Sequence, residues 1–304
     1  MPKRITLFEN LRAVPYTPFY LAIARGDWER EGLDVRVETS PAMAQTAEAL
    51  LDGRADVSWG GPMRVMTYHD KKPDCPLVCF GQVVARDPFI LVGREPNERF
   101  RFQDLARLRV AVADEAPTPW MTFQDDLGRA GLPPGKLKRT PDQAMSDNVA
   151  ALRAGKIDVV QVFEPYAEQL VSEGIGHIWH RFAERGDIAY TSFYTTRDFA
   201  KRQRRTCRVL VKGIGRAQLA LHSEPAADIA RTIRPFFPEL TQRRLARMIS
   251  NYRKSGLWAK TPALPPEAFT RLKAALLSGG LIKRDVPYEN AVDARLSNTK
   301  IDDS

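Results

Sequence analysis

The sequence predicts an α/β protein of two lobes, and three observations lead to this prediction. Short apolar segments alternate with helical segments over the first 190 residues, as in βαβ units of mainly parallel sheets. The alternation comes in two blocks that meet near residue 90, and a nearly all-helical segment follows the second block. That segment needs a sheet on which to bury its apolar faces. We therefore expect residues 1–86 and 190–304 to form lobe I, and residues 87–189 to form lobe II.

In the first block, Leu33, Val35 and Val37 alternate with charged residues, which indicates a strand. An alanine-rich segment at 42–51 predicts a helix that ends at Asp52-Gly53, because glycine is favoured just beyond a helix. The complete set for this block is strands at 5–8, 33–37, 55–59 and 77–84, with helices at 18–25, at 42–51 and after Gly60-Gly61-Pro62.

The second block and the tail follow the same rules. Strands are expected at 89–92, 109–113, 157–162 and 190–195, and helices at 118–130, 142–154, 165–173, 217–222, 226–235, 240–252 and 266–278. Ligands of open α/β sheets bind beyond the carboxyl ends of the strands. Two lobes facing each other would place these ends around one shared cleft.

Composition and charge limit the partners. The chain is 43% hydrophobic and 27% charged, and it has no apolar run long enough for a membrane span. The formal net charge is +9, but the basic residues are spread along the chain, with one dense run at 201–205. A nucleic-acid binder concentrates them on one element, so we expect no nucleic-acid partner. The charge favours solubility, or docking on an acidic partner or an anionic membrane surface.

Cysteine usage and the N-terminus bear on cofactors and compartment. Cys75, Cys79 and Cys207 do not form a disulfide framework or a metal-ligand pattern, and we predict no metal and no cofactor. The segment after Met1 has two basic residues but no apolar signal region. We expect a periplasmic protein if an export leader was removed, and a cytoplasmic one if Met1 is the native start.

Four segments resemble a known family. They are Phe19–Val35, Ala49–Val57 with its Gly-x-Ala-Asp turn, Asp104–Val112, and Ala151–Val159 followed by Phe163-Glu164-Pro165. In this order and spacing they resemble the substrate-binding proteins of ABC transporters for sulfonates, nitrate and thiamine pyrimidine precursors. The resemblance covers residues 5 to about 260.

The resemblance implies the type II periplasmic-binding-protein fold. In this fold two mainly parallel sheets flanked by helices are joined by two hinge strands, here near 84–88 and 187–192, with a helical C-terminal part. It also implies capture of a small organic solute in the inter-lobe cleft by hinge closure. The implied partner is an ABC permease, with at most peripheral membrane association through that permease. Relatives that bind sulfonates place several Ser or Thr residues in the loop between the strand at 109–113 and the next helix, whereas this chain has only Thr118 there, beside Asp114 and Glu115. The Trp, Tyr and Glu residues of the candidate loops favour an aromatic or nitrogen-containing solute over a bare inorganic anion, and a sulfonate-like solute is the other option.

The candidate ligand-binding residues of lobe I lie in loops at strand ends. In the first loop, Asn10 can donate to and accept from a solute, Arg12 can bind an anion unless it only faces solvent, and Tyr16 can stack. Trp59 offers a ring face, unless it is a core residue of a tight turn, and two glycines before a helix expose backbone amides. The lobe I candidates are Asn10, Leu11, Arg12, Tyr16, Trp59, Gly60, Gly61 and Tyr190.

In lobe II the candidates are Asp114, Thr118, Trp120 and Glu164. Glu164 can accept from an amine or an amino-heterocycle. For Asp114 and Thr118, helix capping is an equally good interpretation.

A cytoplasmic enzyme on the same fold is the alternative function, either a decarboxylase or dehydratase acting on a small cyclic acid, or a desulfinase-like enzyme. Desulfinases of the superfamily carry a nucleophilic cysteine in the first loop, where this chain has Asn10-Leu11-Arg12. The fungal pyrimidine synthases need lysine and histidine where this chain has Gly60–Met66, which contains neither. We assign no catalytic residue. An enzyme would use Glu164, Asp114 or Glu115 as acid or base.

Overall fold

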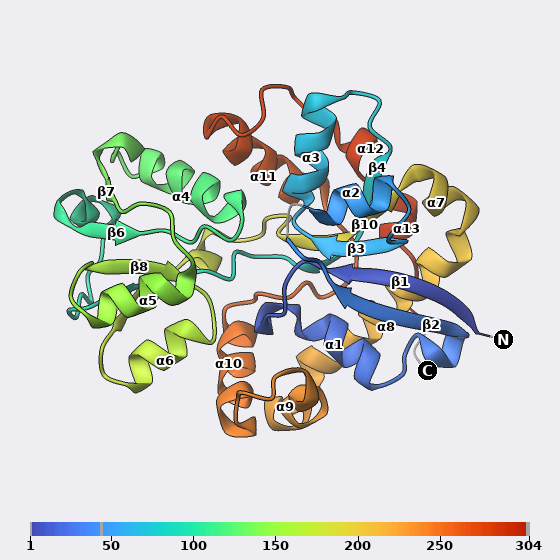
Figure 1. Ribbon diagram of the computed structural model, residues 1–304, viewed down its shortest axis with the longest axis horizontal. Helices are drawn as coiled ribbons and strands as arrows, with labels where there is room; N and C mark the ends of the chain where they lie inside the picture. The colour runs from blue at the N-terminus through green and yellow to red at the C-terminus, as the bar shows by residue number, and fades with distance from the viewer. Residues whose placement is uncertain (1, 43–44, 302–304) are drawn as a thin grey trace. The chain divides into compact units, whose positions relative to one another are not determined.

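A computed structural model describes residues 2–42 and 45–301 and divides the chain into two units (Figure 1). The first unit comprises Met1–Arg86, Asp187–Lys273 and Arg284–Ser304, and the second comprises Asp87–Gly186 and Ala274–Lys283. The helix α11 (Pro266–Ser278) is shared, because its last residues group with the second unit. The sequence had placed this whole tail in lobe I.

The first unit is built on a five-stranded sheet. Its order is β2 (Leu33–Thr39), β1 (Lys3–Glu9), β3 (Val57–Gly60), β10 (Thr191–Thr196) and β4 (Leu77–Val84). Strand β1 runs parallel to β2 and β3, whereas β10 runs antiparallel to both β3 and β4. All residues of β3 and β4 are buried, as expected for strands covered on both faces.

Helices cover both faces of this sheet (Figure 1). One face carries α2 (Gln45–Leu51) and α3 (Pro62–Lys71), and the other carries α1 (Thr17–Ala24) and α8 (Arg204–Ser223). Of the helix predicted at 42–51, residues 43 and 44 lie outside the described residues. Trp28 packs against α8, where its Nε1 donates to the Leu210 carbonyl at 3.1 Å. A Cβ at Gly213, also on α8, would lie 2.3 Å from that nitrogen. The close approach of Trp28 therefore requires glycine at this position.

The helical tail of the first unit confirms the predicted change of pattern after β10. It contains α7 (Arg197–Arg202), α9 (Ala226–Ile233), α10 (Gln242–Lys254), α12 (Tyr288–Ala291) and α13 (Ala294–Ser297). The helix expected at 217–222 is the end of α8, which begins much earlier, at Arg204. Within residues 2–42 and 45–301, no helix combines the length and apolar character that crossing a bilayer requires.

The second unit holds another five-stranded sheet. Its order is β7 (Lys138–Arg139), β6 (Arg109–Ala111), β8 (Val159–Val162), β5 (Ile90–Gly93) and β9 (His177–Arg181). Its helices are α4 (Pro117–Arg129), α5 (Met145–Arg153) and α6 (Tyr166–Ser172). The edge strands β7 and β9 were not in the predicted set, because β7 has only two residues and β9 has no apolar alternation.

The prediction of two mainly parallel sheets is confirmed, because in each sheet four of the five strands run in one direction and a single strand opposes them. In the first sheet β10 is antiparallel to its neighbours, and in the second β5 is antiparallel to β8 and β9. These are strands at which the chain enters a unit from the other one, so they run against the βαβ strands. Residue alternation reports which face a side chain takes but not the direction of a strand.

Near the crossings at 86/87 and 186/187, irregular segments replace the hinge strands that were expected. Residues 85–89 belong to no strand. In the first unit the two passes of the chain are still joined, because Ile188 N donates to the Ala85 carbonyl at 2.7 Å and Tyr190 N donates to the Val84 carbonyl at 3.2 Å.

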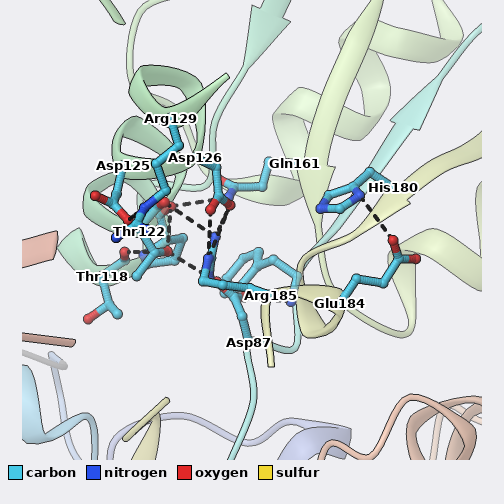
Figure 2. Close-up of polar contacts among 12 residues, drawn as sticks. Asp87, Thr118, Thr122, Asp125, Asp126, Arg129, Gln161, His180, Glu184 and Arg185 are labelled. Atoms are coloured by element: carbon cyan, nitrogen blue, oxygen red, sulfur yellow. Dashed lines mark hydrogen bonds and ion pairs between the residues drawn. The ribbon is translucent and has the colours of Figure 1, made fainter. Parts of the chain in front are cut away.

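In the second unit Arg185, whose side chain is 10% exposed, joins three segments that are distant in the sequence (Figure 2). Arg185 Nη1 donates to Asp87 Oδ2 at 2.9 Å, and Arg185 Nε donates to Asp126 Oδ1 on α4 at 2.9 Å. Asp87 has no exposed surface, and it also accepts from Phe89 N and Thr122 Oγ1. Burial alone would lower the pKa of Arg185, but its bonds and attraction to Asp126 and Asp87 raise the pKa above its ordinary value. The arginine remains charged and is the shared cation of both carboxylates.

We predict that Arg185→Leu destabilises the second unit by about 3–5 kcal/mol, because two carboxylates lose their shared cation in a dry environment. Urea unfolding measures the effect. The matched control is Arg129→Leu, which breaks an exposed pair with Asp125 on the same α4. Equal losses in the two variants would contradict the importance of the buried cluster.

Candidate functional site

The carboxyl ends of β1 and β3 meet the first residues of β10 at one edge of the first sheet. The register pairs Glu9 with Trp59, and Ser192 with Gly60. The loop after β1 and the turn before α3 therefore start side by side. This is the edge at which α/β sheets bind ligands.

Three of the predicted site residues lie close together at this edge. Asn10 Nδ2 donates to Tyr16 Oη at 3.1 Å, and Asn10 Oδ1 accepts from Leu11 N at 2.9 Å. A Cβ at Gly60 would lie 3.5 Å from Asn10 Nδ2 and 3.3 Å from Tyr194 Cε1. Glycine therefore lets the backbone approach both polar side chains. Asn10 is 7% exposed, which leaves its amide ordered before any solute arrives.

Trp59 takes the core position that the sequence left as the alternative. Its side chain has no exposed surface, and it stacks on Phe19 with ring centroids 4.1 Å apart and planes at 13°. Tyr16 and Tyr20 contact it from other sides, with ring centroids 6.3 and 5.8 Å away. The indole Nε1 is buried without a hydrogen-bond partner among the described residues. The ring supports the edge of the sheet and presents no free face.

Arg12 forms an ion pair with Glu9, which was not among the predicted site residues. Glu9, at the end of β1, is completely buried and accepts from Arg12 Nη2 at 2.7 Å. It also accepts from Tyr20 Oη at 2.9 Å and from Thr39 Oγ1 at 2.6 Å. Arg12 therefore neutralises Glu9 and fixes the first loop. Its charge is already balanced within the protein.

Arg64, unlike Arg12, has no counter-ion among the described residues. It lies in the first turn of α3, directly after Gly60-Gly61-Pro62, and only 8% of it is exposed. Its Nε is buried without a hydrogen-bond partner, and no side-chain hydrogen bond or ion pair involves this arginine within the described part of the chain. A buried cation without a counter-ion is costly. The amino end of α3 adds a partial positive charge and free amides.

The charge of Arg64 affects the pKa of two tyrosines. Burial raises the pKa of Tyr16 and of Tyr194, and the positive charge of Arg64 acts in the opposite direction on both. Tyr194 Oη donates to Thr46 Oγ1 on α2, and Tyr16 Oη accepts from Asn10. Both phenols therefore remain neutral hydrogen-bonding groups near a cation, an arrangement suited to an anionic group of a solute.

In the second unit, the predicted residues have different surroundings. Asp114 is exposed and Thr118 is buried, and neither caps α4, whose N-cap Ala116 makes no side-chain bond. The capping interpretation of these two residues was therefore wrong. Trp120 is half-buried, and the Arg139 guanidinium lies over its ring at 4.6 Å from the centroid. That cation–π contact orients the indole.

Glu164 and Tyr190 are both nearly inaccessible. Glu164 is 1% exposed, and its Oε2 accepts from Glu168 N at 2.8 Å, so it holds the first turn of α6. Tyr190, in the first unit, is 8% exposed and follows the crossing segment. A direct contact of either residue with a solute stays a prediction.

The described residues offer little for nucleophilic or metal chemistry. All three cysteines are buried, and burial raises the pKa of Cys79 and of Cys207 to about 12. A reactive thiol needs a lowered pKa. Among residues 2–42 and 45–301, no group of three or more His, Cys, Asp or Glu side chains is arranged to hold a metal ion.

We predict that Arg12→Met destabilises the first unit by about 2 kcal/mol, because the buried carboxyl of Glu9 loses its only cationic partner among the described residues. The loss is smaller than for a fully enclosed pair, since 45% of the Arg12 side chain is exposed. Chemical denaturation checks it, with Arg4→Met as control, because Arg4 pairs with the exposed Asp34. A similar loss for Arg4→Met would count against the role of the Glu9 network.

Comparisons with known proteins agree with this architecture. Residues 85–234 match the model of the NMT1-like family. YtlA of Bacillus subtilis (strain 168), named as a binding protein, is 26% identical over 296 residues, covering 97% of this chain and 89% of its own. A 4-amino-5-hydroxymethyl-2-methylpyrimidine phosphate synthase of Schizosaccharomyces pombe is 31% identical over 114 residues, covering 37% of this chain and 32% of its own.

Among solved structures, the periplasmic aliphatic sulphonate binding protein SsuA from Escherichia coli superimposes with a TM-score of 0.78. It is 16% identical, and the match covers 98% of this chain and 99% of SsuA. This similarity establishes the fold. The chain has the two-unit periplasmic-binding-protein architecture, and it resembles the substrate-binding proteins of ABC transporters along nearly its whole length.

Proposed function

We propose that this protein is the solute-binding component of an ABC-type importer. Its solute is a small organic molecule with an aromatic or nitrogen-containing part and one acidic group, held at the carboxyl edge of the first sheet. The relative YtlA supports a binding role, since it is named as a binding protein and is similar over almost the full length of both chains. A permease is the partner that such a role requires, and the periplasm is the corresponding compartment.

The acidic group of the solute is inferred from the contrast between two arginines at the carboxyl edge of the first sheet. Arg12 is neutralised by Glu9, whereas Arg64 is buried at the start of α3 without an anionic partner among the described residues. A carboxylate or sulfonate of the solute supplies that partner. The guanidinium, the amides at Gly61 and the two neutral tyrosines then share its oxygens.

The rest of the solute is recognised by groups that are already ordered. Asn10 is fixed by Tyr16 and Leu11, so its amide binds with little loss of conformational entropy. In the proposed mechanism, hinge closure brings Trp120 of the second unit to cover the solute. Binding shifts the population toward the closed form, which the permease recognises.

Catalysis is the less favoured function. The three thiols are buried, and Glu164 is engaged by the backbone of its own helix. Neither is prepared for nucleophilic or acid–base chemistry. The similarity to the pyrimidine phosphate synthase covers about a third of that protein and does not extend to the remaining two thirds.

A thermal-shift screen tests the function with chemically matched pairs. The panel contains an aromatic carboxylate and its amide, an aryl sulfonate and its sulfonamide, an aminopyrimidine and an aminopyrimidine carboxylate. A ligand at 100 times its Kd stabilises by about 2.7 kcal/mol, which gives a shift of several degrees. We expect shifts only from the acidic member of a pair, and recovery of that compound unchanged by mass spectrometry. Consumption of the compound would instead indicate an enzyme.

We predict that Arg64→Met abolishes the shift caused by the acidic compound, with a loss of affinity of at least about 30-fold. The same variant should raise the melting temperature of the solute-free protein by about 2 °C, because it removes a buried charge that has no partner. Calorimetric titration and thermal unfolding measure both effects.

Arg12→Met is the matched control, because it also removes one arginine of the same edge. It should lower the melting temperature and retain most of the affinity. Loss of affinity in Arg12→Met together with retention in Arg64→Met would assign the anion to the other arginine and contradict this proposal.

A further inference from the structure

The positive charge of the protein resides entirely in the first unit. That unit contains 32 Lys and Arg against 22 Asp and Glu, whereas the second contains 14 against 15. Within the first unit, residues 197–260 alone hold 16 basic and 4 acidic side chains. The even spread inferred from the sequence was therefore wrong once the residues are assigned to their units.

This excess forms a surface at the junction of α7 and α8. A groove of about 440 Å³ is lined by four basic residues and two acidic ones, Glu289 and Asp293. The surface continues along the exposed side of α8. We name it the basic corner, and it consists of Arg197, Lys201, Arg204, Arg205, Arg208 and Arg295.

Most of this charge is not neutralised by the protein. Arg204 pairs with Asp293 at 3.0 Å. For Lys201, Arg205, Arg208 and Arg295, the described part of the chain supplies no ion pair and no side-chain hydrogen bond. Arg205 and Arg208 are one turn apart and both exposed, so their side chains lie on one face of α8.

We propose that the basic corner binds an anionic phospholipid surface. Unpaired cations on an exposed helical surface are attracted to acidic headgroups by roughly fivefold in partition coefficient for each Lys or Arg. The groove between α7 and α13 (Ala294–Ser297) gives one headgroup phosphate access to several guanidinium groups. This activity is separate from solute capture, since no residue of the corner belongs to the proposed solute site.

A membrane surface fits the corner better than a protein or a nucleic acid does. Protein interfaces are anchored by apolar or aromatic side chains at their centre. The exposed large hydrophobic residues of the described chain are Leu51, Val171, Ile178 and Leu219, and none lies in residues 197–208. Single-stranded nucleic acids stack on aromatic rings, and among the described residues no aromatic side chain lines the groove.

Vesicle co-sedimentation tests the proposal. The full chain is mixed with vesicles of phosphatidylcholine alone, or with 30% phosphatidylglycerol, at low and at physiological salt. The test variant is Lys201→Gln, Arg205→Gln, Arg208→Gln. The control variant is Arg243→Gln, Lys254→Gln, Lys260→Gln, which removes the same charge from exposed positions outside the corner.

We expect the wild type and the control variant to bind only the anionic vesicles, less strongly as salt rises. The corner variant should bind them roughly a hundredfold more weakly. An unchanged melting temperature and an unchanged solute-induced shift would show that the corner variant is folded. This readout also separates failure of the lipid proposal from failure of the proposed solute function.

Three results would overturn the proposal. They are absence of wild-type binding to anionic vesicles, equal weakening in both triple variants, and tighter binding to a single-stranded oligonucleotide than to the vesicles. The second would show that only the net charge matters. The third would assign the corner to a nucleic acid.

Discussion

The insertion of β10 between β3 and β4 is the contact on which the first unit depends. This strand comes more than a hundred residues after its neighbours, and five of its six residues are buried. Its antiparallel pairing places Ser192 beside Gly60 and Phe193 beside Trp59. The aromatic stack around Trp59 and the polar groups near Asn10 are thus assembled from segments that are distant in the sequence. A change that shifts β10 would disturb the core and the proposed site together.

The two arginines of the site edge show how similar residues acquire different roles. Arg12 lies within reach of a buried carboxylate at the end of its own strand, and the pair stabilises the loop. Arg64 is carried by a helix whose start is fixed by two glycines and a proline, and the described fold brings it no acidic side chain. The buried charge of Arg64 therefore lowers the stability of the solute-free protein. Such costs are typical of binding sites, where the missing charge belongs to the ligand.

Much of the fold was accessible from the sequence because its signals are local. Glycine after several of the helices, apolar runs and alternation in 33–37 depend on nearest neighbours, and they located most strands and helices. The direction of β5 and β10 was not accessible, since pairing is a tertiary property. The same limit applied to the site. The sequence shows Glu9, Arg12 and Arg64, but their spacing does not reveal that Glu9 is paired with Arg12 rather than with Arg64. Trp59 was ambiguous for a related reason, because only the packed structure shows Phe19 covering its face.

The tryptophans are divided between the units in a way that separates their optical signals. In the first unit Trp28, Trp59 and Trp258 are at most 2% exposed, whereas Trp120 and Trp179 of the second unit are half-buried. An aqueous collisional quencher such as acrylamide reaches emission from the second unit first. Quenchable and protected fluorescence are thus intrinsic labels for the two units. Unfolding of the first unit would appear as conversion of protected emission into quenchable emission, without any engineered probe.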